Sequence, residues 1–210
     1  MKLEKILEKK YGFSPIVLKD LSVDGMTDVN LRKQLQILVE KGVLQRAGRG
    51  VYYFPKQLKW MQGSIRPSDE TIIERKFIRD TDGNIFGYKT GFNFANSVGL
   101  TTQMPVVVFI VSNKATSEYR KIVVGSTKVV LLKPSVKITN ENYKILRFLD
   151  LLTCMDKFSE LEEEELRSTL RNYVQKERLV FKDMEQYLKF YPDSIYKGLY
   201  RAGVLNEVAA

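Results

Sequence analysis

Apolar residues in the first 41 positions recur at the spacing of helices that bury one face. Leucine and isoleucine near the N-terminus predict a first helix that ends near Gly12. A short second helix is predicted after Ser14-Pro15, because serine caps a helix N-terminus and proline suits the first turn. A third helix is predicted from about Thr27 to Lys41, and its buried stripe consists of Leu31, Leu35, Leu38 and Val39.

Two β-prone runs follow the third helix and surround a glycine-bearing turn. They cover residues 43–46 and 51–54, with Gly48 and Gly50 between them and Pro55 after the second. Such runs around glycine predict a β-hairpin. Three helices followed by a hairpin are the order of a winged helix-turn-helix, which we assign to residues 1–56.

The remaining chain mixes strands and helices. Residues 57–68 are expected to form a linker, and residues 69–210 a second domain that opens with a helix. Its strands are expected over residues 106–111, 121–124 and 128–132, and helices from residue 139 onward. The predicted fold class is therefore α+β, with the winged helix-turn-helix followed by a C-terminal mixed α/β domain that has a helical C-terminal end.

Composition changes this picture mainly through absences. The 210 residues contain no histidine and one cysteine, Cys154. Without histidine there is no Ser-His-Asp or Cys-His nucleophile system, and a lone cysteine allows neither an internal disulfide nor a cysteine-rich zinc site. We therefore expect a non-enzymatic protein with no cofactor and no metal, in a reducing, cytoplasmic setting. No run of about 20 apolar residues predicts a membrane span.

Positive charge is concentrated near the N-terminus. The chain carries a net charge of +9. Residues 1–60 hold 12 basic and 6 acidic side chains, whereas residues 61–210 hold 22 and 19. This excess beside a predicted winged helix favours double-stranded DNA as a partner.

The third helix and the hairpin supply the candidate DNA contacts. Asn30 and Lys33 fall opposite the leucine stripe, where amide and cationic donors suit base edges and phosphates. Arg46 and Arg49 lie on the hairpin, where a wing meets phosphates or the minor groove. The full candidate set is Thr27, Asn30, Arg32, Lys33, Gln34, Gln36, Arg46 and Arg49. A winged helix can also serve as a protein-docking adaptor, and that alternative stays open.

Two segments together resemble a known family. Residues 48–53 read Gly-Arg-Gly-Val-Tyr-Tyr, and residues 90–105 read Thr-Gly-Phe-Asn-Phe-Ala-Asn-Ser-Val-Gly-Leu-Thr-Thr-Gln-Met-Pro before an apolar strand. In this order they resemble the AbiEi-type antitoxins of bacterial abortive-infection systems. The motif positions are Gly91, Gly99, Leu100, Thr101, Thr102, Gln103 and Pro105.

The resemblance implies two activities. One is repression of the protein's own toxin–antitoxin operon through an operator with repeats. The other is an antitoxin effect of the second domain on a nucleotidyltransferase-like toxin, without a stable complex. The residues alone leave two interpretations of the 99–105 run open, because it could be a functional surface loop or a buried polar turn that joins a helix to a strand.

A metal-dependent nuclease or nucleotidyltransferase is the enzymatic alternative. Gly125-Ser126 resembles the start of a nucleotidyltransferase motif, but no paired aspartate follows it. A nuclease needs carboxylates around Mg²⁺ with a nearby lysine. The candidates for that pattern are Glu70, Glu74, Asp80, Asp82 and Lys89. Cys154 lies among apolar residues and is expected to be a core thiol.

Overall fold

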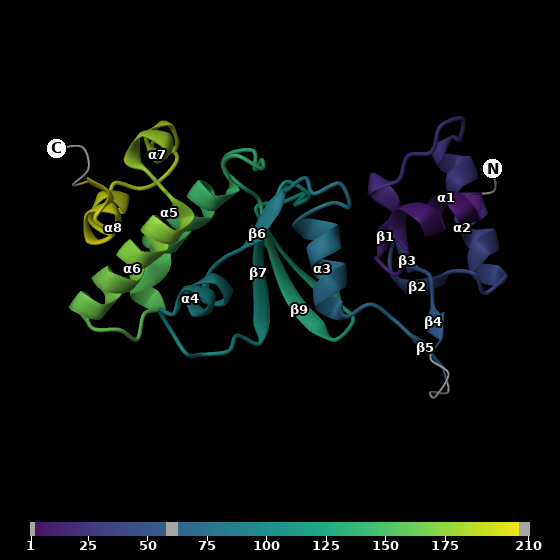
Figure 1. Cartoon of the computed structure of the whole chain (residues 1–210), viewed down its shortest axis with the longest axis horizontal. Coiled ribbons are helices and arrows are strands. Elements are labelled where there is room, and N and C mark those ends of the chain that lie inside the picture. Colours follow the sequence, from purple (N-terminus) through teal and green to yellow (C-terminus); the bar gives the residue numbers. More distant parts are fainter. Residues whose placement is uncertain (1–2, 58–62, 206–210) are drawn as a thin grey trace. The chain divides into compact units, whose positions relative to one another are not determined.

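The computed structural model describes residues 3–57 and 63–205, and its fold is α+β (Figure 1). The chain forms two compact units, one of residues 1–83 with 123–127 and one of residues 84–122 with 128–210. Within the described ranges, no helix is long and apolar enough to cross a membrane.

The N-terminal part of the first unit, residues 3–53, packs two helices against a three-stranded antiparallel sheet. Its elements are α1 (Leu3–Tyr11), β1 (Ile16–Val17), the 3₁₀ helix η1 (Leu18–Asp20), α2 (Asp28–Glu40), β2 (Gln45–Gly48) and β3 (Val51–Tyr53). The strands lie in the order β1-β3-β2. Leu7, Ile16, Leu35 and Leu44 are fully buried in its core. The predicted first and third helices and the hairpin are confirmed.

The short α-helix predicted after Ser14-Pro15 is wrong. Ile16 and Val17 form β1 instead, paired with Tyr52 and Val51 of the hairpin, and only the 3₁₀ turn η1 follows. Both side chains are β-branched and buried, which favours a strand over a helix.

The segment predicted to be a linker is partly ordered. Strands β4 (Lys56–Gln57) and β5 (Ser64–Ile65) pair antiparallel, while residues 58–62 of the predicted linker lie outside the described residues. The Ser64 hydroxyl donates to Gln45 Oε1 at 3.1 Å, which connects this small sheet to the hairpin.

Helix α3 (Asp69–Phe77) groups with the first unit, whereas the sequence assigned it to the second domain. Its buried Arg75 lies 3.8 Å from the Asp20 carboxylate and 5.9 Å from the ring centroid of Tyr11. These contacts with residues far back in the chain move the boundary to residue 83. A sequence pattern carries no sign of them.

The second unit contains most of a four-stranded mixed sheet and the C-terminal helices. Its sheet consists of β6 (Gly87–Lys89), β7 (Val107–Ser112), β8 (Tyr119–Val124) and β9 (Thr127–Leu132), in the order β6-β7-β9-β8. Strands β6 and β7 are antiparallel, and β7 and β9 are parallel. The three predicted strands are confirmed, and β6 was missed because a three-residue strand that begins with a glycine gives no periodic signal.

Five helices complete the second unit, and α5–α8 gather on one side of β6 and β7 (Figure 1). They are α4 (Phe92–Val98), α5 (Tyr143–Cys154), α6 (Glu163–Glu177), α7 (Phe181–Leu188) and α8 (Ile195–Arg201), with the 3₁₀ turn η2 (Met155–Lys157) after α5. Helices α5 and α8 approach closely at Gly198, where a Cβ atom would lie 2.9 Å from the Cβ of Leu152. The predicted helical C-terminal end is therefore confirmed.

Candidate nucleic-acid interface

Helix α2 is held in one orientation by its apolar face and its N-cap. Leu31, Leu35 and Leu38 are buried in the cluster that also contains α1 and the hairpin. The Thr27 hydroxyl accepts a hydrogen bond from the Asn30 backbone N–H at 3.3 Å. Thr27, one of the candidate DNA contacts, therefore caps the helix, as Ser and Thr commonly do.

The polar side chains of α2 lie along its outer face, as the sequence predicted for most of them. Asn30, Arg32, Lys33 and Gln36 are exposed, whereas Gln34 is half-buried. The four exposed groups offer amide and cationic donors to solvent. Gln34 is the candidate whose exposure fits base or phosphate contact least.

One acid, Glu40, lies at the C-terminal end of the same outer face, and the exposed Lys41 follows it at the C-cap. The Gln36 amide donates to Glu40 Oε1 at 3.0 Å, which occupies part of its donor capacity. Lys33 and Asn30 precede this pair along the helix. Most donors for an anionic partner therefore lie in the first two turns of α2, where Asp28 is also an exposed acid.

The hairpin turn is fixed to the core of the first unit. Gly50 has φ +69°, a backbone conformation that favours glycine, and its carbonyl accepts from the Leu18 N–H at 2.9 Å. Arg49 is exposed beside it, and the Arg46 guanidinium lies 5.7 Å from the ring centroid of Tyr52. The hairpin thus presents both candidate arginines, Arg46 on strand β2 and Arg49 in a turn whose position is set by the core.

One further cation near this turn was missed from the sequence. Lys19 is exposed on η1, directly after the residue that bonds to Gly50. The false assignment of an α-helix to this stretch concealed it, because an α-helical phase gives no reason to place Lys19 beside the hairpin.

The Gly-Leu-Thr-Thr-Gln run connects α4 to β7 and is bonded within its own unit. Leu100 and Thr101 are buried, and Gly99 ends α4 with φ +89°. The Thr102 N–H and hydroxyl donate to Glu160 Oε2 at 2.9 and 3.1 Å, and Gln103 Nε2 donates to Glu160 Oε1 at 2.8 Å. These contacts favour the interpretation as a polar turn over that as a free surface loop.

The remaining motif positions differ in exposure. Gly91 precedes α4 and has φ +60°. A Cβ atom at this position would lie 3.8 Å from the Cβ of Phe109. Pro105 is half-buried. The side chains on either side of that proline are outward: Met104 is 83% exposed and Val106 81% exposed. This end of the run therefore presents apolar surface that the sequence analysis did not single out.

The carboxylates considered for a metal site do not gather at one place, and two of them form ion pairs. Glu74 pairs with Arg79, and Asp82 lies 3.7 Å from Lys10 Nζ. Ser126, in the nucleotidyltransferase-like dipeptide, donates its N–H to Asp69 Oδ2 at 2.8 Å. Over residues 3–57 and 63–205, no three Cys, Asp or Glu side chains come together as metal ligands.

Cys154 and Asp150 lie together on α5. The Cys154 thiol donates to the Asp150 carbonyl at 3.1 Å, and burial raises its pKa to about 11. Asp150 itself was missed as a functional candidate. Its signal was available, because it is an acid inside the apolar run of residues 148–152.

The chain matches one family model, described as a family of unknown function, over residues 2–179. This span includes the first unit, the four-stranded sheet and α4–α6, and it ends before α7. No curated protein matches the chain.

Proposed function

The chain belongs to this family of unknown function, DUF6088, and we propose that it is a transcriptional repressor whose first unit binds duplex DNA as a winged helix-turn-helix. The observation that carries the proposal is the split of α2 into a buried leucine face and an exposed donor face. Leu31 and Leu35 anchor the helix, and Asn30 and Lys33 face solvent.

The order of elements in the first unit supports this proposal. A helix, a strand, a short 3₁₀ helix, a longer helix and a hairpin follow one another, and β1 adds to the hairpin as a third strand. In helix-turn-helix proteins the later helix enters the major groove and places its N-terminal residues at base edges. Helix α2 takes that role in our proposal.

The side chains of α2 match groups that DNA displays in the major groove. Asparagine suits the N6 and N7 atoms of adenine, and arginine or lysine suits the O6 and N7 atoms of guanine. We assign base contacts to Asn30 and Lys33 and phosphate contact to Arg32. Glu40 at the end of the helix would repel phosphates, so these contacts use the first two turns, where Asp28 is the one exposed acid.

The hairpin contributes affinity in this account. Arg49 beside the turn, with Arg46 and Lys19 near it, places cations where the DNA backbone passes a wing. Phosphate contacts add binding energy that depends on salt and carries little sequence information.

The second activity that we propose is an antitoxin effect of the second unit against a nucleotidyltransferase-like toxin, without a stable complex. It rests on the resemblance of residues 90–105 to AbiEi-type antitoxins. Since Thr102 and Gln103 bind Glu160, we assign the outward role to Met104 and Val106, whose side chains are exposed.

The experiment for DNA binding measures fluorescence anisotropy of the full chain on two duplexes, one enriched by selection from random sequence and one random. Asn30→Ala or Lys33→Ala should cost about 1–3 kcal/mol on the selected duplex and reduce discrimination. Arg49→Ala should weaken binding to both duplexes about equally. Lys182→Ala, which removes an exposed cation of the second unit, is the control and should leave both affinities unchanged.

Two results would count against this assignment. Loss of discrimination in Arg49→Ala alone would mean that the hairpin recognises the sequence. Equal affinities for wild type and all three variants on both duplexes would favour the protein-docking adaptor.

A further inference from the structure

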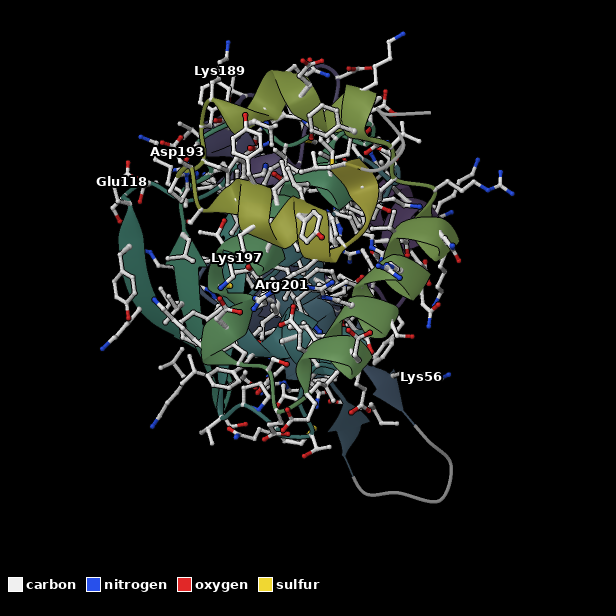
Figure 2. The ribbon with its side chains drawn as sticks, turned by 90° about the vertical axis from the view of Figure 1, so that its left-hand side faces the viewer. Lys56, Glu118, Lys189, Asp193, Lys197 and Arg201 are labelled. Carbon is white, nitrogen blue, oxygen red and sulfur yellow. The ribbon has the colours of Figure 1, made fainter. Side chains whose placement is uncertain are left out.

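The second unit contains a cavity of about 430 Å³ between its sheet and its helices. Strands β6, β7 and β9 contribute Tyr88, Val111 and Leu132, and α5 contributes Leu146, Asp150 and Cys154. The segment between Lys189 and Asp193, on the same side of the unit as Glu118 in Figure 2, supplies Phe190, Tyr191 and Pro192. Cavities of this size and mixed lining are typical of small-molecule sites.

Two carboxylates line this mostly apolar space, and Glu118 is paired with Lys133, whereas Asp150 has no cationic partner among the described residues. Asp150 Oδ2 accepts from the Tyr88 hydroxyl at 2.8 Å, and Oδ1 lies 3.0 Å from the Tyr191 hydroxyl. The Tyr191 hydroxyl also lies 3.3 Å from the Leu146 carbonyl, so its one proton serves two acceptors. Asp150 therefore keeps unfilled acceptor capacity, since each carboxylate oxygen accepts two hydrogen bonds.

No positive side chain of the described residues neutralises this carboxylate. Lys133, at the cavity wall, pairs with Glu118 at 3.1 Å. Arg147 lies on α5 but donates to the Tyr173 hydroxyl at 2.9 Å, with its guanidinium 4.4 Å from the ring centroid of Phe94. A partly buried carboxylate without a cation is costly unless something else compensates its charge.

We propose that this cavity is a binding site for a small organic cation, an ammonium head on a mostly apolar body, with Asp150 as its counter-ion. The ammonium donates to the free lone pairs of the carboxylate. The rings of Tyr88, Tyr191 and Phe190 offer aromatic surface to the cation and its body. Binding does not depend on the DNA-binding proposal, because every residue involved lies in the second unit.

The protonation state of Asp150 gives the site a pH dependence. Burial raises the pKa of Asp150 to about 6, although the two tyrosine hydroxyls oppose that rise. Burial also raises the pKa values of Tyr88 and Tyr191 and brings that of Cys154 to about 11, so all three stay neutral near pH 7. The other charged groups around the site are Lys133 and Glu118 at the cavity wall, Arg147 on α5, and Lys157 near Cys154. Cation binding should weaken as pH falls through about 6.

The test is isothermal titration calorimetry of the full chain with phenethylamine, tryptamine and hexylamine, each a single ammonium group on an apolar body, at pH 7.5. At least one amine should bind saturably, with one site per chain, and 2-phenylethanol, the neutral counterpart of phenethylamine, should not. Asp150→Asn should lower that affinity about tenfold or more, since a charge-assisted hydrogen bond is lost. Glu185→Gln, which removes an exposed acid of α7, is the control and should bind as wild type does.

A pH series on the wild-type chain tests the same carboxylate without a substitution, so a folding defect in the variant cannot account for its result. Affinity for the bound amine should fall about tenfold from pH 7.5 to pH 5, as the carboxylate protonates. The proposal is overturned if none of the three amines binds, or if binding is unchanged by both Asp150→Asn and acid.

Discussion

Glu160 and Thr102 are bonded twice across 58 positions of sequence, through the Thr102 N–H at 2.9 Å and its hydroxyl at 3.1 Å. With Gln103 added, the same carboxylate holds three donors of the run between α4 and β7. The segment that carries the family resemblance is therefore hydrogen-bonded to Glu160, which lies just before α6. The polar groups of Thr102 and Gln103 thus stabilise the fold of the second unit.

Replacing Glu160 should loosen this run in a pH-dependent way. The backbone hydrogen bond from Thr102, followed by that from the Gln103 side chain, lowers the pKa of Glu160 below its ordinary value. The stabilisation is then present above the ordinary carboxyl range and is lost as pH falls through the lowered pKa. Thermal melts of Glu160→Gln should show a lower melting temperature than wild type at pH 7, and a smaller difference at pH 3. A Glu185→Gln chain serves as control, and an identical drop in both variants would contradict the role of Glu160.

Asp150→Asn should stabilise the protein near neutral pH. Because burial raises the pKa of Asp150 to about 6, the folded state binds the proton more tightly than the unfolded chain. The free energy of unfolding therefore falls as pH rises from about 4 to 6, by about 2–3 kcal/mol for a rise of this size. Chemical denaturation should find the variant more stable than wild type at pH 7.5 and about equal to it at pH 4. A variant that is less stable at pH 7.5 would show that the tyrosine hydrogen bonds outweigh the cost of burial.

Gly198→Ala should destabilise the packing of α5 and α8. In an exposed helix, alanine is about 1 kcal/mol better than glycine. Here the new Cβ would lie 2.9 Å from the Cβ of Leu152, which is tied directly to the α5 backbone. Overpacking of this kind costs about 1–3 kcal/mol, so the net effect should be a loss of stability. Ser168→Ala on α6 provides the exposed control, with little change or a small gain, and a gain in both variants would contradict the close approach.

The two proposed activities should separate by surface in the full chain. Lys33→Ala should reduce repression of a reporter promoter and leave rescue from the toxin intact. Met104→Lys combined with Val106→Lys should reduce rescue and leave repression intact, because both side chains are exposed. Circular dichroism should show both variants folded. Rescue that fails in Lys33→Ala would mean that the antitoxin effect is transcriptional.

Local patterns in the sequence were enough to place the elements of the first unit that carry the DNA proposal. The leucines of α2 recur at helical spacing, so its outer face followed from counting, and glycines marked the hairpin. Strand β1 did not follow, because Ser14-Pro15 is typical of a helix start and its pairing partner Tyr52 lies in the hairpin.

Long-range contacts account for the rest of what the sequence left undetermined. The place of α3 in the first unit depends on Arg75 and Asp69, whose partners lie up to 58 positions away. The Asp150 site needs Tyr88 and Tyr191 from two distant segments. Periodicity shows that Asp150 interrupts an apolar stripe, but only the fold shows which hydroxyls meet it.

The central claim, that the first unit binds duplex DNA through α2 and the hairpin, is tested most directly by the salt dependence of affinity. If about four to six phosphates are neutralised, the logarithm of the association constant of the full chain should fall with the logarithm of salt concentration, with a slope of about −4 to −5. Arg49→Ala should reduce that slope by about one, and Lys182→Ala should leave it unchanged. A flat response for the wild-type chain would contradict the account.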